Sequence, residues 1–156
     1  MLLKRLLGQE RKRRVIKCVI DTNVIISAIL NPKGIPGKIV EAWFKHEFLA
    51  VTSEFLLQEL QRVLHYRHIQ RIKLISEKEI NKFVRDIINT SQLIEVSSVI
   101  DVVRKDTADN QVLAAALDGQ VNFIVSGNHH LLDLGHFRGI KIVKPIEFFN
   151  ILDRVK

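Results

Sequence analysis

Acidic side chains occupy three places in the sequence where a folded chain does not put them without a reason. Asp21 ends the apolar run "CVID", and Glu59 falls among the apolar positions of the helical segment 53–64. Asp106 and Asp109 open the segment "DTADNQVLAAAL". A carboxylate in an apolar setting costs free energy unless it is paired or bound to a cation. These residues are therefore the first candidates for chemistry.

Each of these carboxylates also has a structural explanation. Asp21 and Asp106 precede helical patterns and can accept hydrogen bonds from the first backbone amides of those helices. Glu59 can be partly buried beside a lysine or arginine, and Asp109 falls in a first helical turn, where negative charge is stabilising. The sequence leaves both explanations open, because the same residue can cap a helix and take part in catalysis.

Three carboxylates that converge without cysteine fit a hard cation, because Mg²⁺ and Mn²⁺ prefer oxygen ligands and keep several waters. Such ions activate water and offset negative charge on a phosphodiester, often as a pair about 4 Å apart. We therefore interpret Asp21 as a metal ligand that a buried strand delivers to the edge of a sheet.

The apolar patterns predict the elements that position these carboxylates. The expected strands cover residues 15–20, 48–52, 92–96, 121–125 and 140–143. The expected helices cover residues 23–30, 36–47, 53–66, 76–89, 108–119 and 145–152. Ser53 is a helix-capping residue, Ser76 and Glu79 form a capping box, and Gly119 ends a helix.

This alternation of short strands and helices predicts an α/β fold. We expect a three-layer α/β/α sandwich with a central, mostly parallel sheet of about five strands. In such sheets the ligand site lies outside the carboxyl ends of the strands. Asp21 and the polar residues 126–128 follow two of the expected strands and are therefore predicted to lie at that edge.

Length and composition predict one soluble domain. The chain has 156 residues, 47% of them hydrophobic and 26% charged, and we assign residues 17–152 to a single core. No uninterrupted apolar run approaches the roughly 18 residues that a membrane span needs. The single cysteine, Cys18, excludes a disulfide or a cysteine-based metal site within the chain, which favours a reducing cytoplasm.

Positive charge is concentrated in two zones. The net charge is +7, and residues 1–17 hold seven basic residues against Glu10 alone. We expect residues 1–16 to be a basic tail that is disordered and solvated, a nucleic-acid-binding arm, a short membrane-surface helix, or a stretch read from a start codon upstream of the true one. The second zone, from Arg62 to Arg85, has seven basic and two acidic residues. It is either a solvated helical hairpin or a surface that follows an RNA backbone through phosphate contacts.

Four blocks of the sequence resemble the PIN-domain ribonucleases, and among them the toxins of toxin–antitoxin systems. The blocks are "VIDTNVIISAIL", "TSEFLLQELQRVL", "RKDTADNQVLAAAL" and "FIVSGNHHLLDL" followed by "IKIVKPIEFFNIL". They occur in the family's order and cover about residues 17–152. The resemblance implies a PIN-like, Mg²⁺- or Mn²⁺-dependent endoribonuclease of single-stranded RNA. It also implies a homodimer that a small antitoxin protein silences.

The resemblance assigns roles to individual residues. The family's three acids fall on Asp21, Glu59 and Asp109, which are the predicted catalytic residues, and Asp106 is the neighbouring acid. Thr22 or Asn23 would steady the first acid and the phosphate. The predicted metal ligands are Asp21, Glu59, Asp106, Asp109 and Asn128, and the predicted substrate-binding residues are Thr22, Asn23, Ser126, Asn128 and His130.

The fourth block departs from the family's pattern. Related sequences commonly read S-G-D-x-D-L-L here, and Asn128 and His130 replace the two aspartates of that motif. The amide oxygen of Asn128 can still bind a cation or its water but brings no charge, which weakens a second metal site first. His129 and His130 can contact phosphate or act as weak acids near neutral pH, or they are solvated residues at a helix start.

Three functions are compatible with these residues. The first, which we predict, is a metal-dependent ribonuclease. The second is a PIN-like RNA-binding or regulatory protein whose catalysis is weak or lost because Asn128 replaces the fourth acid. The third is another phosphate-handling enzyme, such as a metal-dependent phosphatase. The third is disfavoured because no second aspartate lies two positions after Asp21, where an aspartyl-phosphate enzyme would use it.

Overall fold

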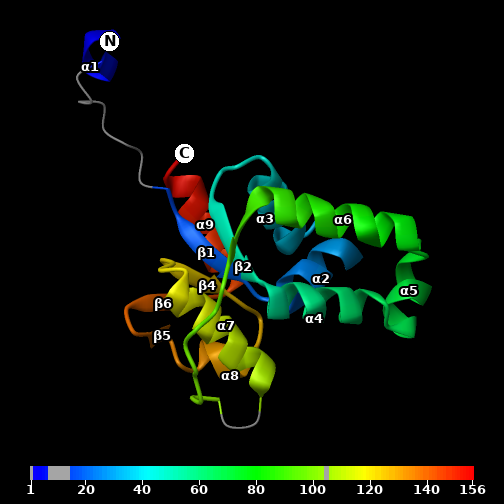
Figure 1. Cartoon of the computed structure of the whole chain (residues 1–156). Coiled ribbons are helices and arrows are strands. Elements are labelled where there is room, and N and C mark those ends of the chain that lie inside the picture. The colour runs from blue at the N-terminus through cyan, green and yellow to red at the C-terminus, as the bar shows by residue number, and fades with distance from the viewer. Residues whose placement is uncertain (1, 7–14, 104–105) are drawn as a thin grey trace.

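A six-stranded sheet lies at the centre of the computed structural model, which describes residues 2–6, 15–103 and 106–156 (Figure 1). The strands are β1 (Lys17–Ile20), β2 (Leu49–Ser53), β3 (Ser91–Ile94), β4 (Phe123–Val125), β5 (His136–Phe137) and β6 (Ile140–Val143). Their order is β3-β2-β1-β4-β6-β5, and all neighbours are parallel except β5 and β6. The carboxyl ends of β1, β2, β4 and β6 therefore meet at one edge.

Helices cover both faces of this sheet (Figure 1). Within the described ranges they are α1 (Leu2–Leu6), α2 (Thr22–Leu30), α3 (Ile35–Phe44), α4 (Glu54–Leu64), α5 (Arg67–Lys73), α6 (Glu77–Thr90), α7 (Thr107–Asp118), α8 (His129–Leu132) and α9 (Pro145–Arg154). Apolar residues of α2, α3, α4, α6 and α9 form the core on one face. On the other face, α7 packs against β1, β2 and β4.

Strand residues alternate between these two cores. Cys18 and Ile20 belong to the core beneath α2, α3 and α9, whereas Val19 between them belongs to the core beneath α7. Successive side chains of a strand point to opposite faces, so a strand that is apolar at every position must be covered on both sides. The continuous apolar run around Cys18 thus leads to a three-layer sandwich, and the predicted fold class is confirmed.

The predicted caps at Ser53 and Ser76 are confirmed, but the capping box is incomplete, because Glu79 Oε1 accepts from the Ser76 hydroxyl at 3.1 Å and not from its backbone amide. The hydroxyl of Ser53 accepts a hydrogen bond from the Leu56 amide at 3.3 Å, and that of Ser76 accepts one from the Glu79 amide at 3.1 Å. Gly119 follows the last residue of α7, where a Cβ atom would lie only 2.6 Å from Cγ1 of Val51. A side chain at this position would push α7 away from β2.

Two elements were not predicted. All five expected strands are present, but the sheet has a sixth strand, β5, whose two residues are too few to produce a periodic pattern. Arg138 and Gly139 join β5 to β6 with φ angles of 47° and 83°, as in the two-residue turns of tight hairpins. The basic segment after α4 also forms a separate helix, α5. The prediction of a hairpin of two helices did not include it.

The predicted tail is described only in part. Leu2–Leu6 form α1, in which Leu2, Leu3 and Leu6 are exposed, while residues 7–14 lie outside the described residues. The role of residues 1–16 and the boundary of the domain at residue 17 stay predictions. In the part of the chain that the structure describes, no helix is both long enough and apolar enough to span a lipid bilayer.

Candidate active site

The carboxyl edge of the sheet has its switch point between β1 and β4. Ile20 pairs with Val125, and the chain leaves β1 toward β2 on one side while β4 lies on the other. The Asp21 amide donates to the Val125 carbonyl at 2.9 Å, so Asp21 and Ser126 emerge side by side just beyond the strands. A crevice at such a point is where open α/β sheets bind ligands.

Asp21 is buried at this edge, with 6% of its surface exposed. Its Oδ2 atom accepts hydrogen bonds from Ser126 Oγ at 2.6 Å and from Asn23 Nδ2 at 3.3 Å. Asp21 precedes α2, but its side chain makes no capping hydrogen bond, which removes the structural explanation for this carboxylate. The pKa of Asp21 is raised to about 6, chiefly by burial.

Glu59 approaches Asp21 from α4. The Thr22 hydroxyl, in the first turn of α2, donates to Glu59 Oε2 at 3.0 Å. Glu59 is half-buried, and among the described residues it forms no salt bridge with a lysine or arginine. Its negative charge contributes to the raised pKa of both Asp21 and Asp109, so the three predicted acids lie close enough to interact.

Asp106 and Asp109 have different roles at the start of α7. Asp106 Oδ1 accepts from the amides of Ala108 and Asp109 at 3.0 and 3.2 Å and so caps the helix. Asp109 is buried and faces Asn128, whose Nδ2 lies 3.0 Å from each of its carboxylate oxygens. Burial, followed by the charge of Asp106, raises the pKa of Asp109.

Asn128 is oriented by bonds at both ends of its amide. Its Oδ1 accepts from the His130 amide at 2.9 Å and caps α8, while Nδ2 faces Asp109. The oxygen that was predicted to meet a cation or its water is therefore used by the backbone in this conformation. Metal binding by Asn128 stays a prediction, and the side chain is seen here as the neutral partner of Asp109.

The predicted substrate-binding residues mostly hold the acids in place. Asn23 donates to Asp21 and accepts from the Gly127 amide at 3.2 Å, linking the turns after β1 and β4. Ser126 is fully buried, and its hydroxyl bonds both Asp21 and the Asn128 amide. His130 is exposed, with its ring centroid 4.1 Å from that of His129. Substrate contact by these residues stays a prediction.

One candidate at this edge was missed by the sequence reasoning. Lys144 is exposed and directly follows β6, whose last residue, Val143, accepts the Ser126 amide at 3.1 Å. A cation here suits a phosphate bound at the carboxyl edge. Its position immediately after an apolar strand run, in "IKIVKP", was the available signal.

Comparison with known proteins decides the family. A family model described as PIN domain matches residues 17–130. The chain belongs to the PIN domain family. It is 34% identical over 119 residues to an uncharacterized protein of Methanocaldococcus jannaschii, covering 76% of this chain and 75% of that one. The crystal structure of VapBC2 from Rickettsia felis bound to a DNA fragment from their promoter contains a chain with the same fold. That match has a TM-score of 0.55 at 16% identity and covers 83% of this chain and 98% of that one.

Family membership agrees with the coarser prediction, a nuclease of the PIN type. Whether this PIN domain can hold the implied cation depends on its donor set. Asp21, Glu59 and Asp109 supply carboxylate oxygens, and their hydrogen-bond partners are the neutral groups of Ser126, Thr22 and Asn128. An ionised carboxylate has about four acceptor sites on its two oxygens, so these hydrogen bonds leave lone pairs that can bind an ion.

The arrangement of the acids in this conformation is open. No three acidic, histidine or cysteine side chains in the described ranges converge tightly enough to enclose an ion. Burial is the main cause of the raised pKa of Asp21 and of Asp109, and the charges of neighbouring acids raise both further, so the carboxylates of the PIN domain still repel one another. A cation that takes only part of its ligands from protein and the rest from water suits such a loose set, which is the usual behaviour of Mg²⁺.

Proposed function

We propose that this protein is an endoribonuclease that hydrolyses phosphodiester bonds of single-stranded RNA with Mg²⁺ or Mn²⁺ as its cofactor. The observation that carries the proposal is that Asp21 and Asp109 lie close enough at the carboxyl edge of the sheet for the charge of Asp109 to raise the pKa of Asp21. Both are buried, both have a raised pKa, and neither forms a salt bridge with a described lysine or arginine. Buried like charges without a cationic partner favour a bound cation.

The residues of the site would divide the work in the following way. Asp21, Glu59 and Asp109 would hold the ion, with Asp106 and Asn128 at its periphery. When bound, the ion supplies a Lewis acid that lowers the pKa of water and offsets charge on the phosphodiester. Ser126 and Asn23 keep Asp21 in one orientation, and Thr22 does the same for Glu59. Lys144 and His130, which are both exposed, would contact phosphate oxygens.

The biological setting is part of the same proposal. We propose a cytoplasmic toxin that acts as a homodimer and is silenced by a small antitoxin protein. Support comes from the fold shared with a chain of the VapBC2 structure and from the toxin-like sequence blocks. The test is purification of the protein co-expressed with the product of a neighbouring small reading frame, followed by measurement of mass and activity.

The activity itself is tested with a labelled single-stranded RNA incubated with Mn²⁺, Mg²⁺ or EDTA. Wild-type protein should cut the RNA only with metal, and Asp21→Asn should not cut it. Asp133→Asn is the matched control, because Asp133 is an exposed acid that follows α8 outside the carboxylate group. Equal activity of wild type and Asp21→Asn would exclude the proposed site.

A second function is favoured by one observation, the contact of Asn128 with both oxygens of Asp109. The amide hydrogens partly offset the negative charge of the Asp109 carboxylate, which then depends less on a bound cation. The alternative is therefore a PIN-like RNA-binding or regulatory protein without turnover. It predicts that RNA is retained on the protein in EDTA and stays intact when Mn²⁺ is added. The same gel that tests cleavage, run beside a filter-binding measurement, separates the two functions.

A further inference from the structure

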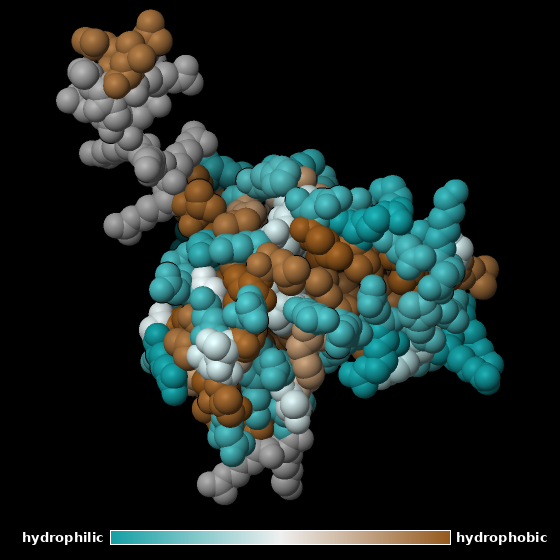
Figure 2. Space-filling view, viewed as in Figure 1, coloured by the Kyte–Doolittle hydropathy of each residue, from teal (hydrophilic) through white to brown (hydrophobic). Residues whose placement is uncertain are grey.

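Helices α4, α5 and α6 form an arm that leads away from the carboxyl end of β2 and comes back to the amino end of the neighbouring parallel strand β3 (Figure 1). Among the described side chains, its surface carries five exposed lysines and arginines that form no salt bridge, which we call the basic arm: Arg62, Arg67, Arg71, Lys78 and Arg85. Most side chains over α5 and the adjoining ends of α4 and α6 are hydrophilic, with some hydrophobic ones among them, as Figure 2 shows; Ile72 and Leu74 are exposed in this region. The charge of this region, noted in the sequence, thus lies on one projecting part of the fold.

These five charges are not neutralised within the described structure. The acids nearby are used elsewhere: Asp86 pairs with Lys82 at 2.8 Å, and Glu77 pairs with His65 at 2.8 Å. No salt bridge between described residues includes a member of the basic arm. An unneutralised group of arginines creates a positive potential that attracts polyanions over about a Debye length, roughly 10 Å at 0.1 M salt.

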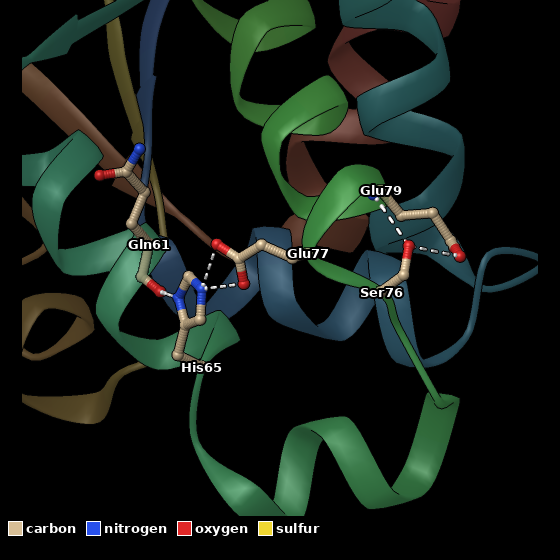
Figure 3. Close-up of polar contacts among 5 residues, drawn as sticks. All are labelled: Gln61, His65, Ser76, Glu77 and Glu79. Atoms are coloured by element: carbon tan, nitrogen blue, oxygen red, sulfur yellow. Dashed lines mark hydrogen bonds and ion pairs between the residues drawn. The ribbon is translucent and has the colours of Figure 1, made fainter.

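A side-chain contact joins the end of α4 to the start of α6. His65 directly follows α4, and its Nε2 lies 2.8 Å from Glu77 Oε2 in the first turn of α6 (Figure 3). Its Nδ1 lies 2.6 Å from the Gln61 carbonyl. Ser76 caps α6 beside this contact (Figure 3). The helix α5 is therefore held between two tied ends, and Arg67 and Arg71, four residues apart, lie on one side of it.

The arm is also connected directly to the candidate active site. Glu59 and Arg62 are both on α4, three residues or about 4.5 Å apart along the helix axis. The carboxylates around Asp21 repel a polyanion, so affinity for the nucleic acid has to come from positive groups beyond them. The basic arm begins within one helical turn of Glu59 and extends outward from it.

We propose that the basic arm binds the phosphates of single-stranded RNA on the strand that leaves the catalytic edge. The inference rests on the proposed function for the choice of RNA, but the arm binds through charge and needs neither metal nor cleavage. Arg67 and Arg71 contact phosphates of nucleotides beyond the cut site, and Tyr66, which is 39% exposed and precedes them, offers a ring beside the strand. The arm therefore binds RNA that is long enough to extend from the cut site to Arg67 and Arg71, and it does not bind shorter RNA.

The experiment uses the double variant Arg67→Ala/Arg71→Ala of the full chain. Alanine is the best helix former, so α5 keeps its structure. The control is Lys141→Ala/Arg154→Ala, which also removes two exposed basic residues, on β6 and in the last turn of α9. Binding of a labelled 20-nucleotide oligouridine is measured by fluorescence anisotropy in EDTA from 50 to 300 mM KCl, with circular dichroism to verify the fold.

Loss of two phosphate contacts should lower the slope of log affinity against log salt by roughly 1.4 and weaken binding roughly 25-fold at 0.1 M KCl. The control variant should bind as wild type does. Equal losses in both variants would mean that only net charge matters, which overturns the proposal. Unchanged binding by Arg67→Ala/Arg71→Ala also overturns it and would leave an acidic protein as the partner of the surface.

A failed ribonuclease assignment is distinguishable from a failed arm. Wild type that binds RNA through Arg67 and Arg71 but never cuts it would refute catalysis alone. Equal cleavage of the 20-nucleotide RNA by wild type and by Arg67→Ala/Arg71→Ala would refute the arm alone. With the arm in use, the variant should cut a trinucleotide at the wild-type rate but a 20-nucleotide RNA more slowly at subsaturating concentration.

Discussion

Ser126 at the end of β4 donates its hydroxyl hydrogen to Asp21 at the end of β1, with 2.6 Å between Oγ and Oδ2. The two residues are 105 positions apart in the sequence and become neighbours because β1 and β4 pair in register. Ser126 is fully buried, so its contact with Asp21 is shielded from water. This bond lowers the pKa of a carboxylate that burial raises, and it therefore favours the ionised form of Asp21.

Replacement of Ser126 by alanine should therefore weaken the site without unfolding the protein. A hydrogen bond to a charged group contributes about 1.5–3 kcal/mol, so the cleavage rate at pH 7 should fall roughly 10- to 100-fold. The rise of activity with pH should shift to higher pH, because Asp21 loses the bond that favours its charge. Rates are measured from pH 5 to 9 beside Ser27→Ala, an exposed serine of α2. A wild-type profile for Ser126→Ala would contradict this role.

Replacement of Asp21 by asparagine should abolish cleavage and stabilise the metal-free protein. The pKa of Asp21 is raised from 3.8 unfolded to about 6 folded, so its ionised form destabilises the fold. The penalty is absent below pH 3.8, grows toward pH 6 and is constant above it, at roughly 3 kcal/mol. Urea unfolding in EDTA at pH 4.0 and pH 7.5 measures the difference. If Asp21→Asn is less stable than wild type at pH 7.5, the ionised carboxylate of Asp21 does not destabilise the fold.

Replacement of Asn128 by aspartate should make the fold more dependent on divalent cations. The change removes the amide donor to Asp109 and adds a third negative charge beside Asp109 and Asp106. The melting temperature in EDTA should fall, and 10 mM Mg²⁺ or Mn²⁺ should raise it more than in wild type, because a ligand that binds only the folded state stabilises it. Asn150→Asp, on the exposed side of α9, is the control. If Mg²⁺ or Mn²⁺ raises the melting temperature of all three proteins equally, position 128 is not part of the metal site.

The His65 contact should make the junction between α4 and α6 sensitive to pH. Both ring nitrogens face acceptors, the Gln61 carbonyl and the Glu77 carboxylate, and these raise the pKa of His65. A raised histidine pKa means that the stabilisation is complete below pH 6.5 and is lost as the pH rises through the folded pKa. Glu77→Gln should lower the His65 pKa in an NMR titration, whereas Glu95→Gln, in the exposed segment after β3, should not. An unmoved His65 titration in Glu77→Gln would refute the contact.

The accuracy of the predicted fold and the gaps in the predicted site have different physical causes. Runs such as 18–20 and 123–125 are apolar at every position, which requires burial on both faces and leads to strands between layers of helices. Caps such as Ser53 are local signals, because donor and acceptor are three residues apart. The strand β5 has no such pattern, since two residues pair only after the turn at Arg138 and Gly139 brings them back to β6.

The sequence by itself determined the fold class and the PIN-like order of motifs, and it singled out the three candidate acids. Only the tertiary structure decided which partner each acid has: Ser126 for Asp21, Thr22 for Glu59 and Asn128 for Asp109. Burial and periodicity are properties of one segment, so they are readable along the chain. The partner of a buried carboxylate depends on strand pairing and helix placement across the whole domain, because short-range hydrogen bonds select among groups that are distant in sequence.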